Sequence, residues 1–324
     1  MRISVAFPYQ LSDLSQLRFA CRVGRELGCA RVWSGQSFGL DPLLAGAALS
    51  KDLGPLGFGV AVTLMPLRHP LQAGLEARTL ASVLDGPVAV GLGVSERAYV
   101  EGNLGLPYER PLSFARDYVS VVKRAVASDR VDHDGPHFRV HDDLLPLDHG
   151  GAEVLLGAIN PRMAALAGEI ADGCVTWLAP AGHLARTLVP AVAEGARDRG
   201  REVPPVVALA PFVATTSRTV ARRVGRVAVG THIRRPHYRK MLLAAGLHEE
   251  DGEPDLDDAL LDALVNWGSR EDIAESVRRF DEAGVDELVV CAYLDPDEGP
   301  RLFERTVEEV VEAAGLLAGT AAVG

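Results

Sequence analysis

The chain has 324 residues, of which 48% are hydrophobic and 24% charged, so its apolar content is sufficient for one large core or two smaller ones. Its formal net charge of -11 disfavours a nucleic-acid or anionic-membrane surface, because such surfaces need clustered Lys and Arg. We therefore expect the partner to be a small molecule or a modified peptide, with no nucleic acid and no membrane involved.

The start of the chain already reads as a strand at 2–7, with no charged segment and apolar run before it, so we expect no signal peptide. No run reaches the roughly 18 apolar residues that a membrane span needs. The four cysteines form no C-x-x-C pair, so neither a zinc site nor a disulfide framework is indicated. These features predict a cytoplasmic protein.

Short, nearly continuous hydrophobic runs recur along the chain, as expected for strands that are buried on both faces of a parallel sheet. The eight predicted strands cover residues 3–7, 30–33, 58–64, 88–94, 154–158, 174–178, 206–214 and 287–294.

Helical patterns alternate with these strands, and the predicted helices cover residues 15–27, 70–84, 113–126, 161–170, 181–198, 270–283 and 301–315. Eight βα repeats predict a (β/α)8 barrel, which we expect to form a single domain over residues 1–324. A doubly wound sheet is the alternative, but no glycine fingerprint follows the first strand. Two segments exceed a minimal barrel: 128–150, a hairpin around Gly135-Pro136, and 230–265, with inserted helices expected to shape the substrate mouth.

Histidines and aspartates gather in the first of these segments, where His133, His137, His141 and His149 stand. Their spacing matches no standard metal-ligand pattern, and the stretch is polar sequence around a Gly-Pro turn. We interpret it as a solvated hairpin and predict no metal site.

Three other motifs each have a functional and a structural interpretation. Gly91 and Gly93 end the fourth strand, where a ligand ring could approach the backbone closely, although glycine can also simply end a strand. The turn from Gly157 to Pro161 opens a helix, and free N–H groups there could bind an anion. Arg234, Arg235, His237, Arg239 and Lys240 form a basic cluster that could hold an anionic group or be a solvated helix face.

In their order and spacing, the segments of this chain resemble the bacterial luciferase-like monooxygenase superfamily, especially its branch that uses the deazaflavin coenzyme F420. The resemblance covers nearly the whole chain. The segments that carry it are ELGCARVW with DPLLAGAAL (26–49), VAVTLMPLRHP (60–70), VAVGLGV (88–94), LGLPYERP (104–111), VLLGAINPRMAALAGEIADG (154–173) and GSREDIAESVRRFDEAGVDELVV (268–290).

The resemblance implies a (β/α)8 barrel with the cofactor ring in its mouth, backed by a bulge at the end of strand three that often holds a non-prolyl cis peptide. It also implies F420 as cofactor, with FMN as the alternative, and a homodimer. Gly268 and Ser269 would be a weaker second anion site. The implied cofactor-binding residues are Val60, Ala61, Val62 and Thr63 at the bulge, Gly157, Ala158 and Ile159 at the phosphate, and Thr176 and Trp177 beside the tail.

The largest departure from the family pattern is VWSGQSFG at 32–39. F420-dependent dehydrogenases of the superfamily typically carry an Asp-His pair after this tryptophan, the histidine acting as base on an alcohol. Gln36 and Ser37 occupy those positions here. An unassisted serine does not take a proton near neutral pH, so alcohol oxidation is disfavoured.

We therefore expect an enzyme that delivers hydride from reduced F420 to an activated C=C or C=N bond of an enone, imine or dehydroamino acid. Gln36 and Ser37 would donate hydrogen bonds to substrate or ring. The proton would come from Tyr99, His69, Glu96 or water. The alternatives are an FMN-dependent monooxygenase and a catalytically inactive flavin-binding paralogue.

Overall fold

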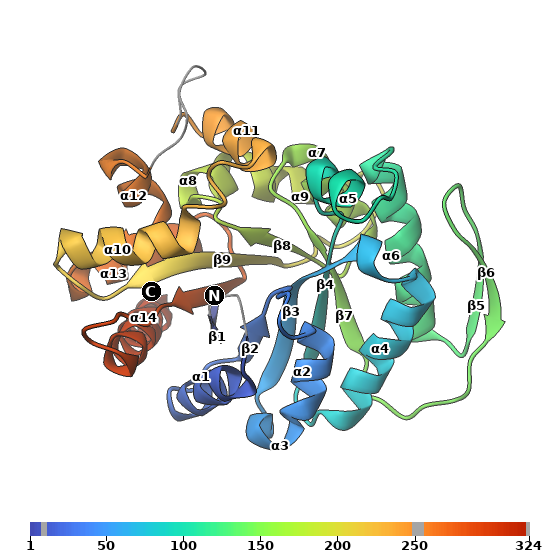
Figure 1. Cartoon of the computed structure of the whole chain (residues 1–324), viewed down its shortest axis with the longest axis horizontal. Helices are drawn as coiled ribbons and strands as arrows, with labels where there is room; N and C mark the ends of the chain where they lie inside the picture. The colour runs from blue at the N-terminus through green and yellow to red at the C-terminus, as the bar shows by residue number, and fades with distance from the viewer. Residues whose placement is uncertain (8–11, 248–255, 322–324) are drawn as a thin grey trace.

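A closed barrel of eight parallel strands forms the centre of the computed structural model, which describes residues 1–7, 12–247 and 256–321 (Figure 1). Neighbouring strands pair around the whole barrel, and the last strand pairs back with the first. All eight predicted strands and the (β/α)8 fold are confirmed. The barrel strands are β1 (Arg2–Ala6), β2 (Arg31–Ser34), β3 (Gly57–Leu64), β4 (Val88–Gly93), β7 (Ala152–Gly157), β8 (Gly173–Trp177), β9 (Val206–Val213) and β11 (Glu287–Ala292).

The predicted helices surround the barrel, and the 181–198 helix is divided by a π-helical turn at Leu184–Leu188. Pro190 is the second residue after that turn and has no N–H to donate, which accounts for the change of helical geometry. Within the described residues, no helix is both long enough and apolar enough to cross a membrane. The helices with predicted counterparts are α1 (Leu14–Glu26), α4 (Pro70–Val83), α6 (Pro111–Ala127), α7 (Pro161–Ile170), α8 (Ala181–His183), α9 (Val189–Arg197), α13 (Arg270–Glu282) and α14 (Pro300–Ala321).

Short helices absent from the prediction follow three strands: α2 (Pro42–Ala48) and α3 (Ser50–Leu53) after β2, α5 (Arg97–Gly102) after β4, and α10 (Arg218–Val229) after β9. A 3-10 turn, Met65–Leu67, also precedes α4. The helices α2, α3 and α5 have four to seven residues each, which is too short to show a helical period. The hydrophobic pattern therefore does not predict them.

The first insertion is the predicted hairpin, formed by β5 (Arg130–Asp134) and β6 (Arg139–Asp143) beside α6 (Figure 1). Its anchor is Asp117 of α6, a buried carboxylate that accepts hydrogen bonds from the backbone N–H groups of His137 (2.7 Å) and Phe138 (2.8 Å) and also contacts the ring of His133. His133 and His137 therefore serve to fasten the hairpin. No group of three or more potential metal ligands is found in the described part of the chain.

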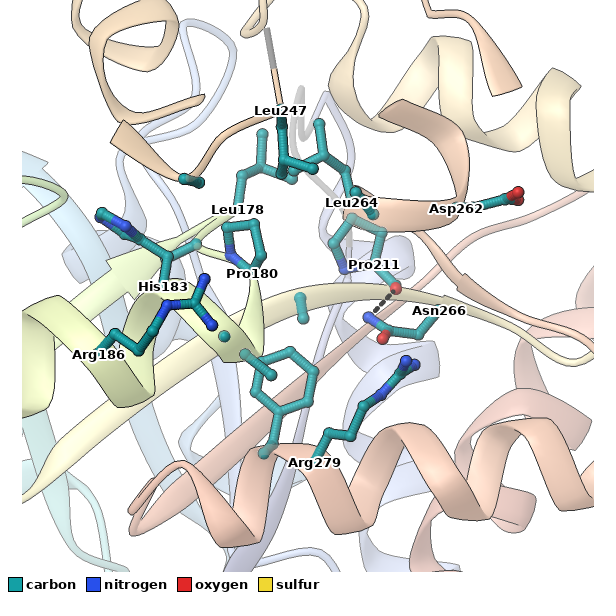
Figure 2. Close-up of a pocket in the computed structure, with 17 residues that line it drawn as sticks. Leu178, Pro180, His183, Arg186, Pro211, Leu247, Asp262, Leu264, Asn266 and Arg279 are labelled. Atoms are coloured by element: carbon teal, nitrogen blue, oxygen red, sulfur yellow. Dashed lines mark hydrogen bonds between the residues drawn. The ribbon is translucent and has the colours of Figure 1, made fainter. Parts of the chain in front are cut away.

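The second insertion contributes α11 (Pro236–Ala244), α12 (Asp258–Leu264) and the two-residue strand β10 (Asn266–Trp267), which pairs with β9. Residues 248–255 of the predicted insertion lie outside the described residues. A cavity of about 230 Å³ lies between the ends of β8 and β9 and the helices α8, α12 and α13 (Figure 2).

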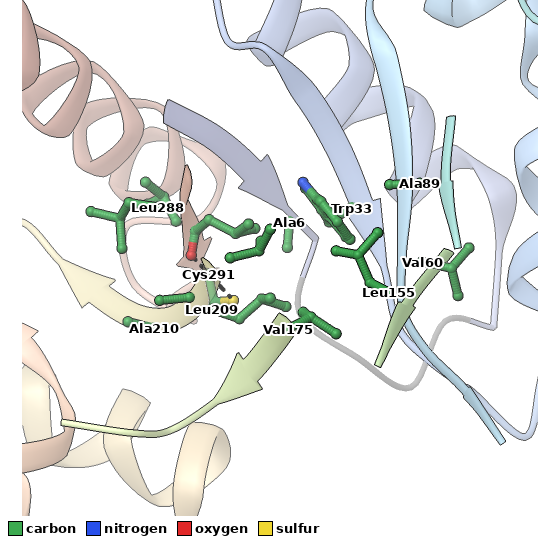
Figure 3. Close-up of a cluster of buried hydrophobic side chains, with 14 of the residues drawn as sticks. Ala6, Trp33, Val60, Ala89, Leu155, Val175, Leu209, Ala210, Leu288 and Cys291 are labelled. Atoms are coloured by element: carbon green, nitrogen blue, oxygen red, sulfur yellow. Dashed lines mark hydrogen bonds between the residues drawn. The ribbon is translucent and has the colours of Figure 1, made fainter. Parts of the chain in front are cut away.

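The barrel interior is packed with apolar side chains from every wall, including Ala6, Trp33, Leu155 and Val175 (Figure 3). Trp33 is fully buried and lies against Gly59 of the next strand, where a Cβ would overlap its ring. Near the amino ends of the strands the interior holds polar groups that are buried, except for the half-exposed Glu153. We call these the basal cluster, comprising Ser4, Arg31, Trp33, Glu153 and Glu287.

Candidate active site

The end of β3 bulges where the sequence predicts it. Its pairing with β4 shifts register between Val60 and Thr63, and the peptide bond between Ala61 and Val62 is cis. The backbone N–H of Gln36 donates to the carbonyl of Val62 over 3.1 Å, which ties the end of β2 to the bulge. The predicted bulge with a non-prolyl cis peptide is confirmed, and that it binds a cofactor stays a prediction.

The side chain of Val62 lies over the glycines at the ends of the neighbouring strands. A Cβ at Gly93 would be 2.5 Å from Val62 Cγ2, and at Gly91 and Gly157 it would be 3.3 Å and 3.0 Å from Cγ1. Gly93 and Gly157 therefore leave space for Val62, whereas a Cβ at Gly91 would first meet Val60 O at 2.5 Å. The sequence left open whether Gly91 and Gly93 admit a ligand ring or simply end the strand. The Val62 side chain is an aliphatic group that could contact the face of a flat ring.

Gln36 and Ser37 differ in what they offer to a ligand. The Ser37 hydroxyl oxygen is buried and accepts hydrogen bonds from the backbone N–H groups of Gly39 (3.0 Å) and Leu40 (3.4 Å), so it fixes the turn that leads to α2. Gln36 Nε2 donates to the Ser37 carbonyl over 2.9 Å. That bond uses one of the two amide N–H groups, and Oε1 is a buried acceptor with no partner among the described residues.

The three predicted proton donors lie in different surroundings. The Tyr99 ring packs 5.6 Å from that of Phe38, so α5 lies against the β2–α2 segment. Glu96 is an ion-pair partner of Arg235 and lies 3.2 Å from His237 Nδ1. His69 is exposed, caps α4 through Nδ1, and packs edge-on against Phe138 of the hairpin.

Residues of the second insertion contact two of the barrel loops. The His232 ring packs 5.7 Å from Trp177 at the end of β8 and 5.3 Å from Tyr238 of α11. With the Arg235 and His237 contacts to Glu96, the segment bridges the loops after β4 and β8. Part of the basic cluster thus binds a carboxylate of this chain, while Arg234 and Lys240 are exposed.

The burial of the His232 imidazole predicts that the protein loses stability in acid. Burial, followed by the nearby Arg235 and His237, lowers the pKa of His232 to about 4, while an unfolded histidine titrates near its ordinary 6.5. Between those values the unfolded chain binds more protons, so stability should fall as the pH falls from 6.5 towards 4, by on the order of 1 to 2 kcal/mol. Urea unfolding of the parent and His232→Phe at pH 7 and 5 measures this. An equal pH dependence in both proteins would contradict it.

Hydrogen bonds within the chain engage residues at both predicted anion sites. Ala158 N donates to Val175 O over 2.9 Å, and the Asn160 side chain caps α7 by accepting from Met163 N over 3.0 Å. Ala158 therefore has a defined backbone role, and its binding of phosphate stays a prediction. At Ser269 the start of α13 is occupied by the helix's own Asp272 carboxylate in a capping box, which disfavours the weaker anion site.

Thr176 and Trp177 do not face the same way. Alternate residues of a strand point to opposite faces, and Val175 faces the interior, where it lies close to Gly91. Trp177 therefore lies on the mouth side together with Val175, and Thr176 points towards the helices and is buried. Of the two residues, Trp177 is the one placed to contact a ligand in the mouth.

Comparison with known proteins decides the family. The family model described as luciferase-like monooxygenase matches residues 1–287, which is most of the chain. The chain belongs to the luciferase-like monooxygenase family. The resemblance found in the sequence is thereby confirmed.

Relatives of this luciferase-like chain include a protein of Mycobacterium tuberculosis, provisionally named as a coenzyme F420-dependent oxidoreductase. It is 27% identical over 308 residues, which cover 82% of this chain and 88% of the relative. Among solved structures, the coenzyme F420-dependent tetrahydromethanopterin reductase of Methanopyrus kandleri has a TM-score of 0.81 at 20% identity, covering 97% of this chain and 98% of the other. An F420-dependent secondary alcohol dehydrogenase, solved with an F420-acetone adduct, has a TM-score of 0.77 at 19% identity, covering 96% and 99%. At these identities the solved structures support the luciferase-like fold.

Several features of the luciferase-like mouth were missed by reading the sequence. They are the niche that Gly93 and Gly157 make for Val62, the His232 contact with Trp177, and the buried hydroxyl of Ser34, which has no partner among the described residues. Thr63, which the resemblance assigns to the cofactor, also has a buried hydroxyl with no partner among those residues. The Gly-rich ends of β4 and β7 were the available signal for the niche. His232 offered none, because its partner lies on another element of the chain.

Proposed function

We propose that this chain is an F420-dependent oxidoreductase that delivers hydride to an activated C=C or C=N bond of a small molecule, such as an enone, imine or dehydroamino acid. The family, and relatives whose names specify coenzyme F420, support the cofactor. The direction of hydride transfer is argued from the residues of the mouth.

The observation that carries the proposal is the end of β2. By the family resemblance, Gln36 and Ser37 align with the acid and the histidine of F420-dependent dehydrogenases, and neither side chain can act as a base near neutral pH. The Ser37 oxygen is moreover engaged with two backbone N–H groups. A site without a base at this position is suited to an acceptor that needs positioning and polarisation.

The residues of the mouth fit a deazaflavin. Bound F420 supplies the hydride. Val62 would support the ring face, and the unpartnered Gln36 Oε1 would accept a hydrogen bond from a ring N–H. Trp177, whose ring packs against that of His232, would exclude water from one side of the cofactor ring.

Of the predicted proton donors, Tyr99 is the one whose ring lies against the β2–α2 segment. Glu96 is engaged by Arg235 and His237, and His69 is exposed at the start of α4. We therefore assign the proton to Tyr99 or to water and do not assign it to Glu96 or His69.

The direction of transfer is tested by two anaerobic assays. With saturating F420, the protein should not reduce the cofactor when given secondary alcohols. With reduced F420, an enone or imine acceptor should oxidise it. Alcohol oxidation by the parent protein would refute the proposal, and its appearance only in the double variant Gln36→Asp, Ser37→His would support the role assigned to these positions.

The cofactor is tested by replacing Gln36. Gln36→Leu removes the buried acceptor, so the Kd for F420 should rise about tenfold, the usual effect of one lost hydrogen bond in a buried site. Gln72→Leu, an exposed amide on α4, is the matched control and should bind F420 like the parent. Fluorescence titrations with F420 and FMN measure both. Tighter binding of FMN would favour the monooxygenase alternative, and binding of neither the inactive paralogue.

The expected homodimer and cytoplasmic location stay predictions. Phe38 and Leu44, on the segment after β2, are each 68% exposed, and we propose that this side of the chain takes part in self-association. Light scattering of the parent and a Leu44→Glu variant tests it, with a lower mass expected for the variant.

A further inference from the structure

The cavity beside the mouth is not used by the proposed hydride transfer. It lies outside β8 and β9, between the segment after β8 and the helices α12 and α13 (Figure 2). Most of its wall is apolar, and its volume of about 230 Å³ is smaller than that of pockets for drug-sized ligands, so it has room only for a compact ligand. The apolar wall includes Leu178, Pro180, Pro211, Leu247, Leu264 and Phe280.

The backbone is unusual where this wall begins. Leu178, the residue directly after Trp177, has a φ of 58°, in the left-handed region that bulky residues rarely adopt. Such conformations concentrate at functional sites, where the surrounding structure holds them. This turn places Leu178, Ala179 and Pro180 on the cavity wall.

The charged groups of the wall favour an anion. Arg186 is an exposed residue whose guanidinium extends towards the cavity and has no ion-pair or hydrogen-bond partner within the described part of the chain (Figure 2). It lies across Gly182, where a Cβ would be 3.0 Å from Nη1 and 3.3 Å from Nη2. Asp262, the acid of the wall, points away and accepts from Trp267 Nε1 over 3.0 Å. Arg279 adds a second positive charge.

We propose that this cavity binds a small organic carboxylate with an apolar body, its carboxylate paired with Arg186. The Arg186 guanidinium matches a carboxylate, while the second guanidinium, that of Arg279, already donates to Ser276 Oγ over 2.8 Å. The aliphatic wall matches a hydrocarbon chain better than a sugar or an inorganic ion. This binding does not depend on the proposed function.

Binding is measured by calorimetry on the full chain without cofactor, so a failed F420 assay leaves the result interpretable. The probes are hexanoate, its neutral counterpart 1-hexanol, and inorganic phosphate. Hexanoate should bind at least about tenfold more tightly than 1-hexanol, as expected for a charge-assisted pair. Equal binding of the two, or binding of phosphate without hexanoate, would overturn the proposal.

Variants identify the site. Arg186→Gln should weaken hexanoate binding about tenfold and leave 1-hexanol unaffected. Arg197→Gln, an exposed arginine on α9, is the matched control and should bind like the parent. Unchanged hexanoate binding in Arg186→Gln, with the variant folded by circular dichroism, would refute the assignment.

Discussion

Replacing Glu287 with alanine should lower the free energy of unfolding by about 3 to 5 kcal/mol, the usual cost of breaking a buried ion pair. Glu287 is fully buried at the start of β11 and accepts hydrogen bonds from Ser4 Oγ (2.7 Å), Trp33 Nε1 (2.8 Å) and Arg31 Nη1 (3.1 Å). The substitution would leave three buried donors without this acceptor. Arg31 would retain only the half-exposed Glu153.

Urea unfolding measures the loss, and Glu304→Ala is the matched control. Glu304 pairs with Arg22 on the surface, where both side chains are about half exposed, so its removal should cost less than about 1 kcal/mol. Glu287→Gln should fall between the two, because it keeps an oxygen acceptor but not the charge. Similar losses for Glu287→Ala and Glu304→Ala would show that the basal cluster does not stabilise the barrel.

The strands of the barrel could be predicted because the residues of each strand show by themselves that the strand is buried. A strand covered by helices on one face and by the barrel interior on the other needs apolar residues at nearly every position, as in Val206–Val213. The basal cluster could not be predicted in this way. Arg31 and Glu287 begin their strands, where a charged residue normally indicates solvent, and their sequence separation of 256 gives no sign that they pair.

The candidate site also has some features that one short segment predicts and others that depend on residues distant in the sequence. The bulge at Ala61 and Val62 could be predicted from family resemblance, since it belongs to one short segment. The ion-pair partners of Glu96 could not be predicted, because Arg235 and His237 belong to the second insertion, which is distant from Glu96 in the sequence. Ser37 shows a further limit: its type suggested a ligand-facing hydroxyl, but the turn that follows uses its oxygen as an acceptor.

Placing a methyl group at Gly93 should impair cofactor binding. In Gly93→Ala the new Cβ would lie 2.5 Å from Val62 Cγ2, too close for any real contact. Valine has one strongly preferred side-chain rotamer in a given backbone, so Val62 would have to move as a unit with the bulge. We expect a stability loss of about 1 to 3 kcal/mol from overpacking and a Kd for F420 raised at least about tenfold.

A second substitution separates packing from binding. Adding Val62→Ala removes the overlapping methyl group, so the double variant should regain most of the stability lost in Gly93→Ala. Its F420 affinity should stay low, because the proposed support for the ring is gone. Gly102→Ala, at a glycine with no atom within 4 Å of its added Cβ, controls for the loss of glycine alone. If the double variant bound F420 like the parent, Val62 would not support the ring, and the glycines at the ends of β4 and β7 would serve only the fold.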